Sequence, residues 1–238
     1  MTPPARLHLP LGQTISPVSG VSLVYSEDHN QTGQFMINTF GKEIIPPNDE
    51  ARLEALKRYE VLDTPHEEYF DRMARMAAMI FNMPIALVSF VDKERVFFKA
   101  NVGMPGVENV SRGVSLCALA VLDDDVTVFE RPLEEPCLLA NPLVTGEFGL
   151  RFYAGAPIRT PDGYNIGTLC LVDKKPRYIT EDQKTLLADL AGVVADLLVG
   201  RLALAKLARN GKASDGEARL PSDSTSSNTA SDVVVNFR

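Results

Sequence analysis

A strong turn signal in the second half of the chain constrains the fold more than any other feature. Residues 160–163 read Thr-Pro-Asp-Gly, and proline followed by aspartate and glycine favours a tight turn. The segments on either side, residues 152–159 and 164–172, have the composition of strands. Because a tight turn joins antiparallel strands, this region predicts a β-hairpin.

A second pair of strands precedes this hairpin. Residues 84–91 form a largely apolar run of strand length, residues 92–95 read Asp-Lys-Glu-Arg, and residues 96–102 read as the partner strand. No strand–helix–strand repeat occurs along the chain. The pattern therefore favours an α+β fold, in which helices gather on one face of an antiparallel sheet, over a doubly wound parallel sheet.

Helix starts are marked by capping signals. Thr64 is followed by Pro65 and by Glu67, and Thr180 is followed by Gln183. Both spacings are those of a capping box, so they predict helices that start near residues 64 and 180.

An irregular region separates the two strand pairs. We expect a loop over residues 103–114, a short helix over 115–122, a strand over 126–129 and an irregular insert over 130–149. The insert is too small to cover both faces of a sheet. We therefore expect it to cover the face opposite the terminal helices and to wall a cavity there.

Composition divides the chain into three parts. Residues 1–47 predict a flexible leader, residues 48–208 a folded domain and residues 209–238 a disordered tail, because the ends are rich in small and polar residues. A helix over residues 180–208 would be about 43 Å long. Its excess length is interpreted in one of two ways. It either forms a dimer contact together with a first helix, for which Asn48 is a suitable N-cap, or it packs against its own domain.

Charge and hydropathy restrict the partners. The net charge of −7 includes no basic stripe, so nucleic acid is not expected as a partner. No run approaches the roughly 18 apolar residues of a membrane span, and the N-terminus lacks the apolar segment of a secretory signal. We therefore expect a cytoplasmic protein that does not associate with a membrane.

The pocket candidates from residue patterns are Cys117, Arg151, Phe152 and Tyr153. Cys117 begins a predicted short helix, where the helix dipole favours a thiolate; it is interpreted as a redox-responsive or ligand-contacting thiol, or as a small core residue. Strand alternation places Phe152 and Tyr153 on opposite faces. Arg151 would either bind an anionic ligand or hydrogen-bond carbonyl groups of the loop at residues 141–142.

Six short motifs in this order resemble the GAF domain family of bacteria. They run from residue 62 to residue 170 and are specific as a set, although each is weak alone. They are residues 62–65 (LDTP), 84–89 (PIALVS), 115–118 (SLCA), 141–144 (NPLV), 151–157 (RFYAGAP) and 162–170 (DGYNIGTLC).

The resemblance implies an antiparallel sheet of about six strands, a small-molecule pocket between sheet and insert, and helical ends that often mediate dimers. Leu119 stands where relatives commonly have histidine, and Ala118 follows Cys117 where bilin-attaching domains have histidine. The signature of cyclic-nucleotide-binding members is also absent. The cofactor is therefore unknown, and no metal site is expected. Leu119 and Phe148 join the pocket candidates.

The expected function is that of a sensory module rather than an enzyme, because only a short tail follows the domain. It would bind a small molecule and signal through its terminal helices, as a homodimer or to a histidine kinase or another signalling partner. One alternative is a ligand-free scaffold, its pocket filled by Leu116, Leu119, Phe148 and Phe152. The other is a thiol-based redox sensor or a free methionine-R-sulfoxide reductase, although Cys117 and Cys170 are far apart in sequence.

Overall fold

The computed structural model describes residues 38–216, with side chains up to residue 209. The predictions for residues 1–37 and 217–238 lie outside the described residues. The chain divides into two units, Met1–Leu202 and Ala203–Arg238. The first unit contains the whole sheet, and its fold is described below.

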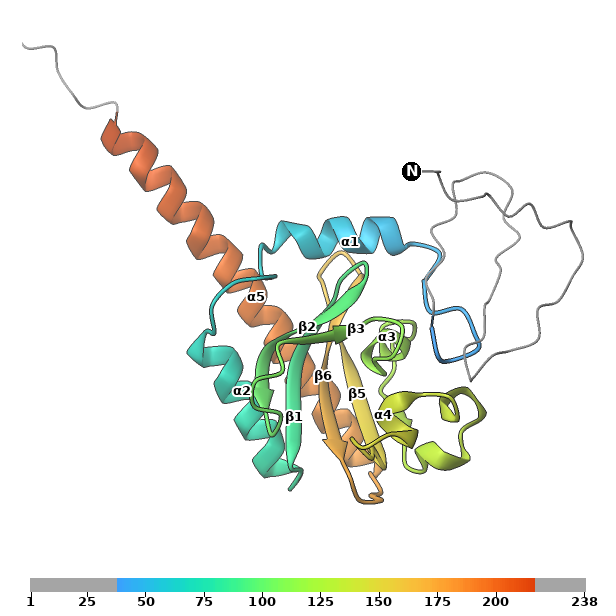
Figure 1. Cartoon of the computed structure of the whole chain (residues 1–238). Coiled ribbons are helices and arrows are strands. Elements are labelled where there is room, and N and C mark those ends of the chain that lie inside the picture. Colours follow the sequence, from blue (N-terminus) through green and yellow to red (C-terminus); the bar gives the residue numbers. More distant parts are fainter. Residues whose placement is uncertain (1–37, 217–238) are drawn as a thin grey trace, which may run out of the picture. The chain divides into compact units, whose positions relative to one another are not determined.

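A six-stranded antiparallel sheet forms the centre of this unit (Figure 1). The two expected hairpins supply its four central strands, and they pair with each other through β1 and β6. The α+β prediction with about six strands is confirmed. In sheet order, the strands are β3 (Asn109–Ser111), β2 (Arg95–Val102), β1 (Ile85–Val91), β6 (Asn165–Asp173), β5 (Phe152–Arg159) and β4 (Thr127–Phe129).

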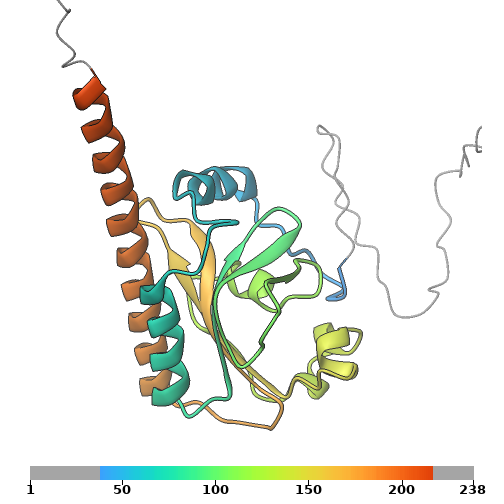
Figure 2. The same cartoon turned by 60° about the vertical axis from the view of Figure 1, so that its left-hand side comes forward.

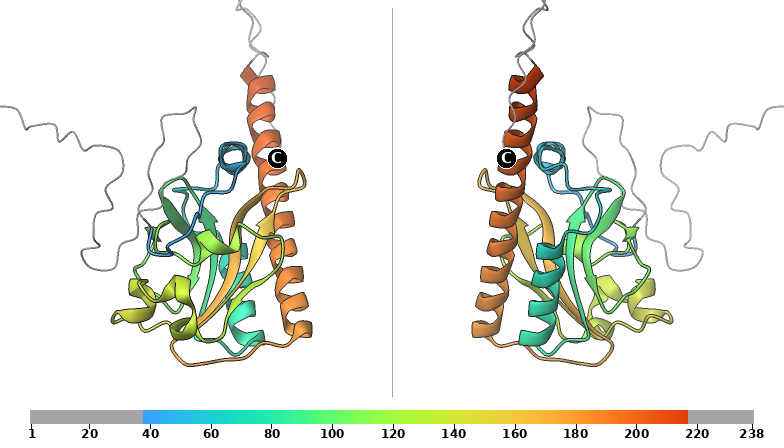
Figure 3. Two further views of the ribbon diagram at one scale, coloured as in Figure 1. Left: turned by 90° about the vertical axis from the view of Figure 1, so that its right-hand side faces the viewer. Right: turned by 90° about the vertical axis from the view of Figure 1, so that its left-hand side faces the viewer.

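Helices cover both faces of the sheet. On one face, α2 (Glu68–Ile80) lies alongside the first part of α5 (Glu181–Gly216), as Figure 2 shows. The opposite face carries the short helices of the insert (Figure 3). The remaining helices are α1 (Asp49–Arg58), α3 (Cys117–Ala120), η1 (Pro132–Glu134), η2 (Pro136–Leu138) and α4 (Pro142–Thr145). None of the described helices is both long enough and apolar enough to cross a membrane.

Strand alternation divides the buried side chains into two cores. Phe152 and Ala154 of β5 pack into the core under α2 and α5, whereas Tyr153 between them points into the core under the insert. Successive side chains of a strand point to opposite faces, so one strand serves both cores. The expected position of the insert, opposite the terminal helices, is confirmed.

One of the two predicted capping boxes is present. The Thr180 amide donates to Gln183 Oε1 at 3.0 Å, and the Gln183 amide donates to Thr180 Oγ1 at 3.2 Å. The prediction at Thr64 is wrong, because α2 begins at Glu68 and Glu67 precedes it without a side-chain cap. Thr64 and Glu67 instead contact the buried Lys99 of β2.

Three further features differ from those that the sequence indicated. Residues 109–111 lie in the region expected to be a loop but form the edge strand β3. Residues 38–47 belong to the predicted leader, yet Phe40 and Ile44 are buried in the core under the insert. The buried Arg112 joins this segment to the domain: its Nη2 donates to the Ile44 carbonyl at 3.4 Å and to Asp49 Oδ1 at 2.8 Å. Helix α5 continues to Gly216, beyond the predicted end of the domain.

Candidate functional site

A cavity of about 390 Å³ lies between the sheet and the insert. Gly103, Pro105 and Lys174 line it and are exposed, so it reaches the surface. Most of its wall is apolar. The lining residues are Leu87, Phe98, Gly103, Met104, Pro105, Val107, Val110, Ser115, Leu116, Cys117, Leu143, Phe148, Leu150, Tyr153, Cys170, Val172 and Lys174.

The three central strands of the sheet supply the floor of the cavity. Leu87 of β1 stands opposite Cys170 of β6, and Gly155 of β5 is the other register partner of Cys170. Cys117 approaches from α3. Segments distant in sequence therefore meet at Cys170, because this residue lies in the middle of the sheet.

The two thiols of the cavity wall are close together. Cys117 Sγ and Cys170 Sγ are 3.7 Å apart, and both side chains are buried. Donation from Cys170, helped by the Ser89 and Thr168 hydroxyls, lowers the pKa of Cys117 to about 5, although burial opposes the shift. The same interaction raises the pKa of Cys170 well above its usual value. The pair therefore loses its first proton much more readily than its second.

Tyr153 lines the cavity, and its hydroxyl group is buried without a partner among the described residues. The residue is 2% exposed, and its Oη has no hydrogen-bond partner among the described residues. Burial, and then the nearby Cys117 and Cys170 thiols, raise its pKa well above 10, so the hydroxyl remains protonated and able to donate. An unpaired buried hydroxyl costs about 1–3 kcal/mol, and a bound molecule with an acceptor group would remove this cost.

A cation and an aromatic ring meet at the exposed side of the cavity. Lys174 Nζ lies 4.8 Å from the centre of the Phe148 ring. The ammonium group faces solvent, whereas the thiols and Tyr153 lie inside. No group of three or more histidine, cysteine, aspartate or glutamate side chains suited to a metal ion occurs among the described residues.

Three of the six sequence candidates line this cavity: Cys117, Phe148 and Tyr153. Phe152 is fully buried on the opposite face of the sheet, so its placement in the pocket is corrected. The alternation rule that separates it from Tyr153 is the physical reason.

Leu119 and Arg151 also lie outside the cavity lining. Leu119 is buried at 4% exposure among its neighbours in the core under the insert. Arg151 Nη1 donates to the carbonyl groups of Val144 and Leu150 at 2.9 and 2.8 Å. The role is structural, as one interpretation expected, but the acceptors are not those of the loop at residues 141–142. Its guanidinium group holds the insert rather than facing a ligand.

Sequence reasoning missed four polar residues near the thiols or at the cavity, namely Ser89, Thr168, Ser115 and Lys174. Ser89 and Thr168 are fully buried, and their hydroxyl oxygens are 2.9 Å apart across β1 and β6. Each is a polar residue in an otherwise apolar strand, and this was the available signal. Lys174 follows β6 in a polar segment, and nothing in its local sequence distinguishes it from other surface lysines.

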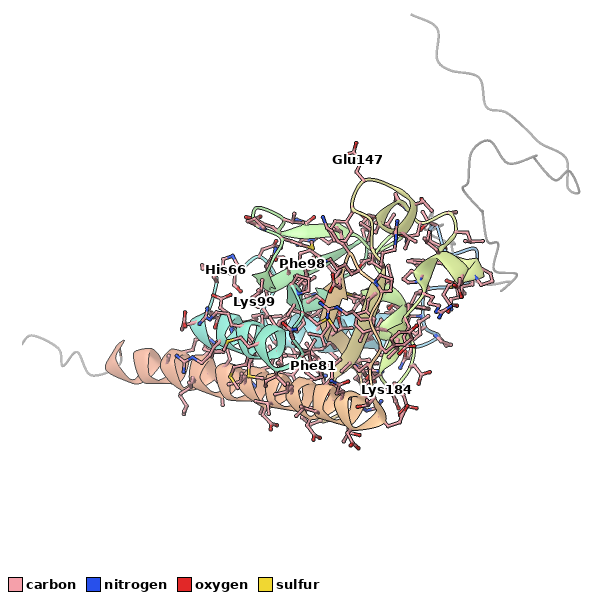
Figure 4. All side chains as sticks on the ribbon, turned by 90° about the horizontal axis from the view of Figure 1, so that it is seen from below. His66, Phe81, Phe98, Lys99, Glu147 and Lys184 are labelled. Carbon is pink, nitrogen blue, oxygen red and sulfur yellow. The ribbon has the colours of Figure 1, made fainter. Side chains whose placement is uncertain are left out.

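A buried ion network connects β2 to the helices on the other face. Lys99 is 1% exposed, and its Nζ lies 2.6 Å from Glu67 Oε1. Arg201 of α5 donates to the same carboxylate at 2.9 Å and to the Tyr59 carbonyl at 2.7 Å. Phe98, which precedes Lys99, lines the cavity, and Figure 4 labels both residues. Adjacent residues of β2 thus contact the cavity and the ion network.

Comparison with known proteins identifies the family of this chain. A model of the GAF domain family matches residues 65–198. A cyclic di-GMP phosphodiesterase of Pseudomonas aeruginosa is 35% identical to this chain over 132 residues, which is 56% of this chain and 22% of that enzyme. The chain therefore corresponds to less than a quarter of the length of that curated relative.

Among solved structures, the GAF domain of an Acinetobacter phosphoenolpyruvate-protein phosphotransferase is 17% identical, with a TM-score of 0.49 over 64% of this chain and 95% of that chain. The free methionine-R-sulfoxide reductase of Neisseria meningitidis is 17% identical, with a TM-score of 0.46 over 66% of this chain and 91% of that chain. Since the family model matches more than half of the sequence, this chain belongs to the GAF domain family of signalling and sensory modules.

Proposed function

We propose that this chain is a regulatory module that binds a small, mostly apolar molecule in the cavity and signals through its terminal helices. The observation that carries the proposal is the Tyr153 hydroxyl, which is buried at the cavity and has no partner among the described residues. Buried polar groups normally have a hydrogen-bond partner. A ligand acceptor atom would supply it.

The cavity limits the chemistry of the ligand. Its volume of about 390 Å³ is at the lower end of the range typical of ligand sites, about 300–1,000 Å³. The apolar wall favours a hydrocarbon or aromatic body. Tyr153 favours an acceptor group at the inner end, and Lys174 favours an anionic group at the exposed end. We therefore expect a compact apolar acid or carbonyl compound.

The cavity offers little support for the ligand-free scaffold. That alternative required Leu116, Leu119, Phe148 and Phe152 to fill the pocket. Leu116 and Phe148 line the cavity instead, Leu119 lies beside it, and Phe152 packs on the other face of the sheet. An open volume remains between sheet and insert.

Strand β2 is the proposed connection between the ligand and the helices. A ligand that displaces Phe98 would shift Lys99, and Lys99 shares the Glu67 carboxylate with Arg201 of α5. Two arrangements of α2 and α5 would then be populated differently in the free and the bound chain. The exposed Met79 and Val193 on these helices support a helical contact with a second copy or with a signalling protein such as a histidine kinase.

Native mass spectrometry of the full chain purified from its source organism tests the proposal. We expect a bound small molecule that is released on denaturation. Leu143→Trp would fill the cavity and abolish the mass excess. Leu133→Trp is the matched control, because Leu133 is 48% exposed in the same insert and lies outside the cavity lining. Ligand binding would be contradicted if the wild-type chain carried no small molecule and if no apolar acid or carbonyl compound raised its stability.

A second experiment isolates the signalling step. Arg201→Ala would leave the ligand contacts in the cavity intact, because Arg201 lies outside the cavity lining. It would, however, remove the ligand-dependent change in amide hydrogen exchange of α5. Light scattering would show whether a dimer forms. Proteins of cyclic di-GMP turnover are the first partners to test, because the curated relative is an enzyme of that class.

Reduction of a sulfoxide is a second candidate function, favoured by the thiol pair. The separation of Cys117 and Cys170 in sequence was an argument against it, but their sulfur atoms lie 3.7 Å apart at the cavity. Turnover of free methionine sulfoxide by the wild type, and its loss in Cys117→Ser, would support this function. An inactive wild type would remove it.

A further inference from the structure

Cys117 and Cys170 lie on elements of unequal rigidity. Cys170 is fixed in the middle of the sheet by pairing on both sides of β6. Cys117 lies on α3, a helix of four residues. The sulfur atoms are 3.7 Å apart, and a disulfide requires about 2.05 Å. A shift of α3 by less than about 2 Å would therefore close the bond.

We propose that Cys117 and Cys170 form a reversible disulfide when a small hydroperoxide enters the cavity, so that the cavity wall is also a redox switch. This inference goes beyond ligand binding and does not depend on the identity of the ligand. Both sulfurs line a cavity that reaches the surface, which gives a small oxidant access to them.

The reaction balances with the hydroperoxide as the oxidant. The Cys117 sulfur attacks one peroxide oxygen, the O–O bond breaks, and a sulfenic acid and an alcohol (or water, from hydrogen peroxide) result. The Cys170 sulfur then attacks the Cys117 sulfur. The S–S bond forms, the S–O bond breaks, and water leaves with the Cys170 proton. The two thiols lose two electrons and two protons in total, and the hydroperoxide gains them.

The surroundings of the thiols favour this chemistry. The hydroxyls of Ser89 and Thr168 lower the pKa of Cys117 together with the Cys170 thiol, so the nucleophilic thiolate is populated. Tyr153 stays protonated and has no hydrogen-bond partner among the described residues. Its hydroxyl is therefore available to donate to the leaving oxygen.

The third cysteine provides an internal control. Cys137 is half-buried in the insert and lies outside the cavity lining. Exposure alone would favour the oxidation of Cys137, whereas the proposal requires the buried pair to react first.

Thiol counting on the full chain tests the proposal. The reduced protein is treated with hydrogen peroxide, denatured, alkylated and analysed by mass spectrometry. We expect the three alkylatable cysteines to fall to one, a peptide pair joined through Cys117 and Cys170, and full recovery with dithiothreitol. The proposal is overturned if Cys117 and Cys170 both remain alkylatable, or if the disulfides that form involve Cys137.

Variants identify the order of the two steps. In Cys170→Ala, peroxide should stop at a Cys117 sulfenic acid that dimedone traps, whereas Cys137→Ala should form the disulfide as the wild type does. The wild-type thiol count decides the question even if a variant folds poorly. An absence of bound ligand in native mass measurements would leave this result intact, so the two proposals fail separately.

Discussion

The hydroxyl of Tyr153 lies directly over Gly155. A Cβ built at Gly155 would lie 2.3 Å from Tyr153 Oη and 2.7 Å from its Cζ. The two residues are two positions apart on β5, so their side-chain positions face the same way. The missing side chain at residue 155 is therefore what allows the Tyr153 ring to lie flat along the strand at the floor of the cavity.

Replacing Gly155 by alanine should displace the Tyr153 ring. Because Tyr153 is buried, the ring cannot move without disturbing its neighbours, and we expect a loss of about 1–3 kcal/mol in the free energy of unfolding. Urea denaturation would measure it. Gly192→Ala in α5 is the control: no atom lies within 4 Å of its added Cβ, so a gain of up to about 1 kcal/mol is expected from helix propensity. Equal stability of Gly155→Ala and the wild type would contradict the close contact.

Tyr153→Phe should stabilise the ligand-free chain. The substitution removes a buried hydroxyl without a partner among the described residues, and such a group costs about 1–3 kcal/mol. Chemical denaturation after ligand removal would show the gain, and the same variant should bind the ligand more weakly. Tyr178→Phe is the control, since Tyr178 is 68% exposed and should change stability by less than about 0.5 kcal/mol. A destabilised Tyr153→Phe would mean that the hydroxyl has a partner in the free protein.

Lys99→Met should destabilise the fold by about 1.5–3 kcal/mol, because it removes the hydrogen bonds of a buried charged group, although Glu67 keeps its ion pair with Arg201. Lys99 Nζ contacts Thr64 Oγ1, the Pro65 carbonyl and Glu67 Oε1, each at 2.6 Å. Thermal and urea unfolding would measure the change.

The matched control for this substitution is Lys57→Met. Lys57 forms an ion pair with Glu54 at 3.9 Å, and its side chain is 80% exposed, so its removal should change stability by less than about 0.5 kcal/mol. If the two lysine variants were equally stable, the Lys99 network would not contribute as described.

Cys117 should stay reactive at a pH where ordinary thiols do not. The Cys170 thiol and the nearby hydroxyls hold its pKa at about 5, whereas a free cysteine titrates near 8.5. The rate of alkylation by iodoacetamide, followed in Cys137→Ala, should therefore be nearly flat from about pH 6 to 8 and fall below about pH 5. Cys170→Ala removes the main donor and should move the midpoint upward. If the midpoint of the wild-type rate profile lay near the pKa of a free thiol, Cys117 would not be a thiolate at neutral pH.

Local patterns predicted most of the fold. The Thr-Pro-Asp-Gly turn sets the β5–β6 hairpin, with Gly163 at φ 89°, and alternation correctly placed Phe152 and Tyr153 on opposite faces. Local signals failed where a residue had a distant partner. Thr64 and Glu67 have capping-box spacing but bind Lys99. Arg201 of α5 also has a distant partner, because it reaches Glu67.

The sequence by itself determined the antiparallel pairing of the strands, the covering of both faces of the sheet and the family. Turns, strand alternation and short motifs indicate these features, and all three are properties of neighbouring residues. The tertiary structure alone decided the site. Cys117 and Cys170 are 53 residues apart, and their sulfurs meet because sheet register fixes one and the packing of α3 fixes the other. The same holds for Phe40 and Ile44, which join the core under the insert only through contacts with distant segments. Such contacts depend on register and packing, which no local pattern encodes.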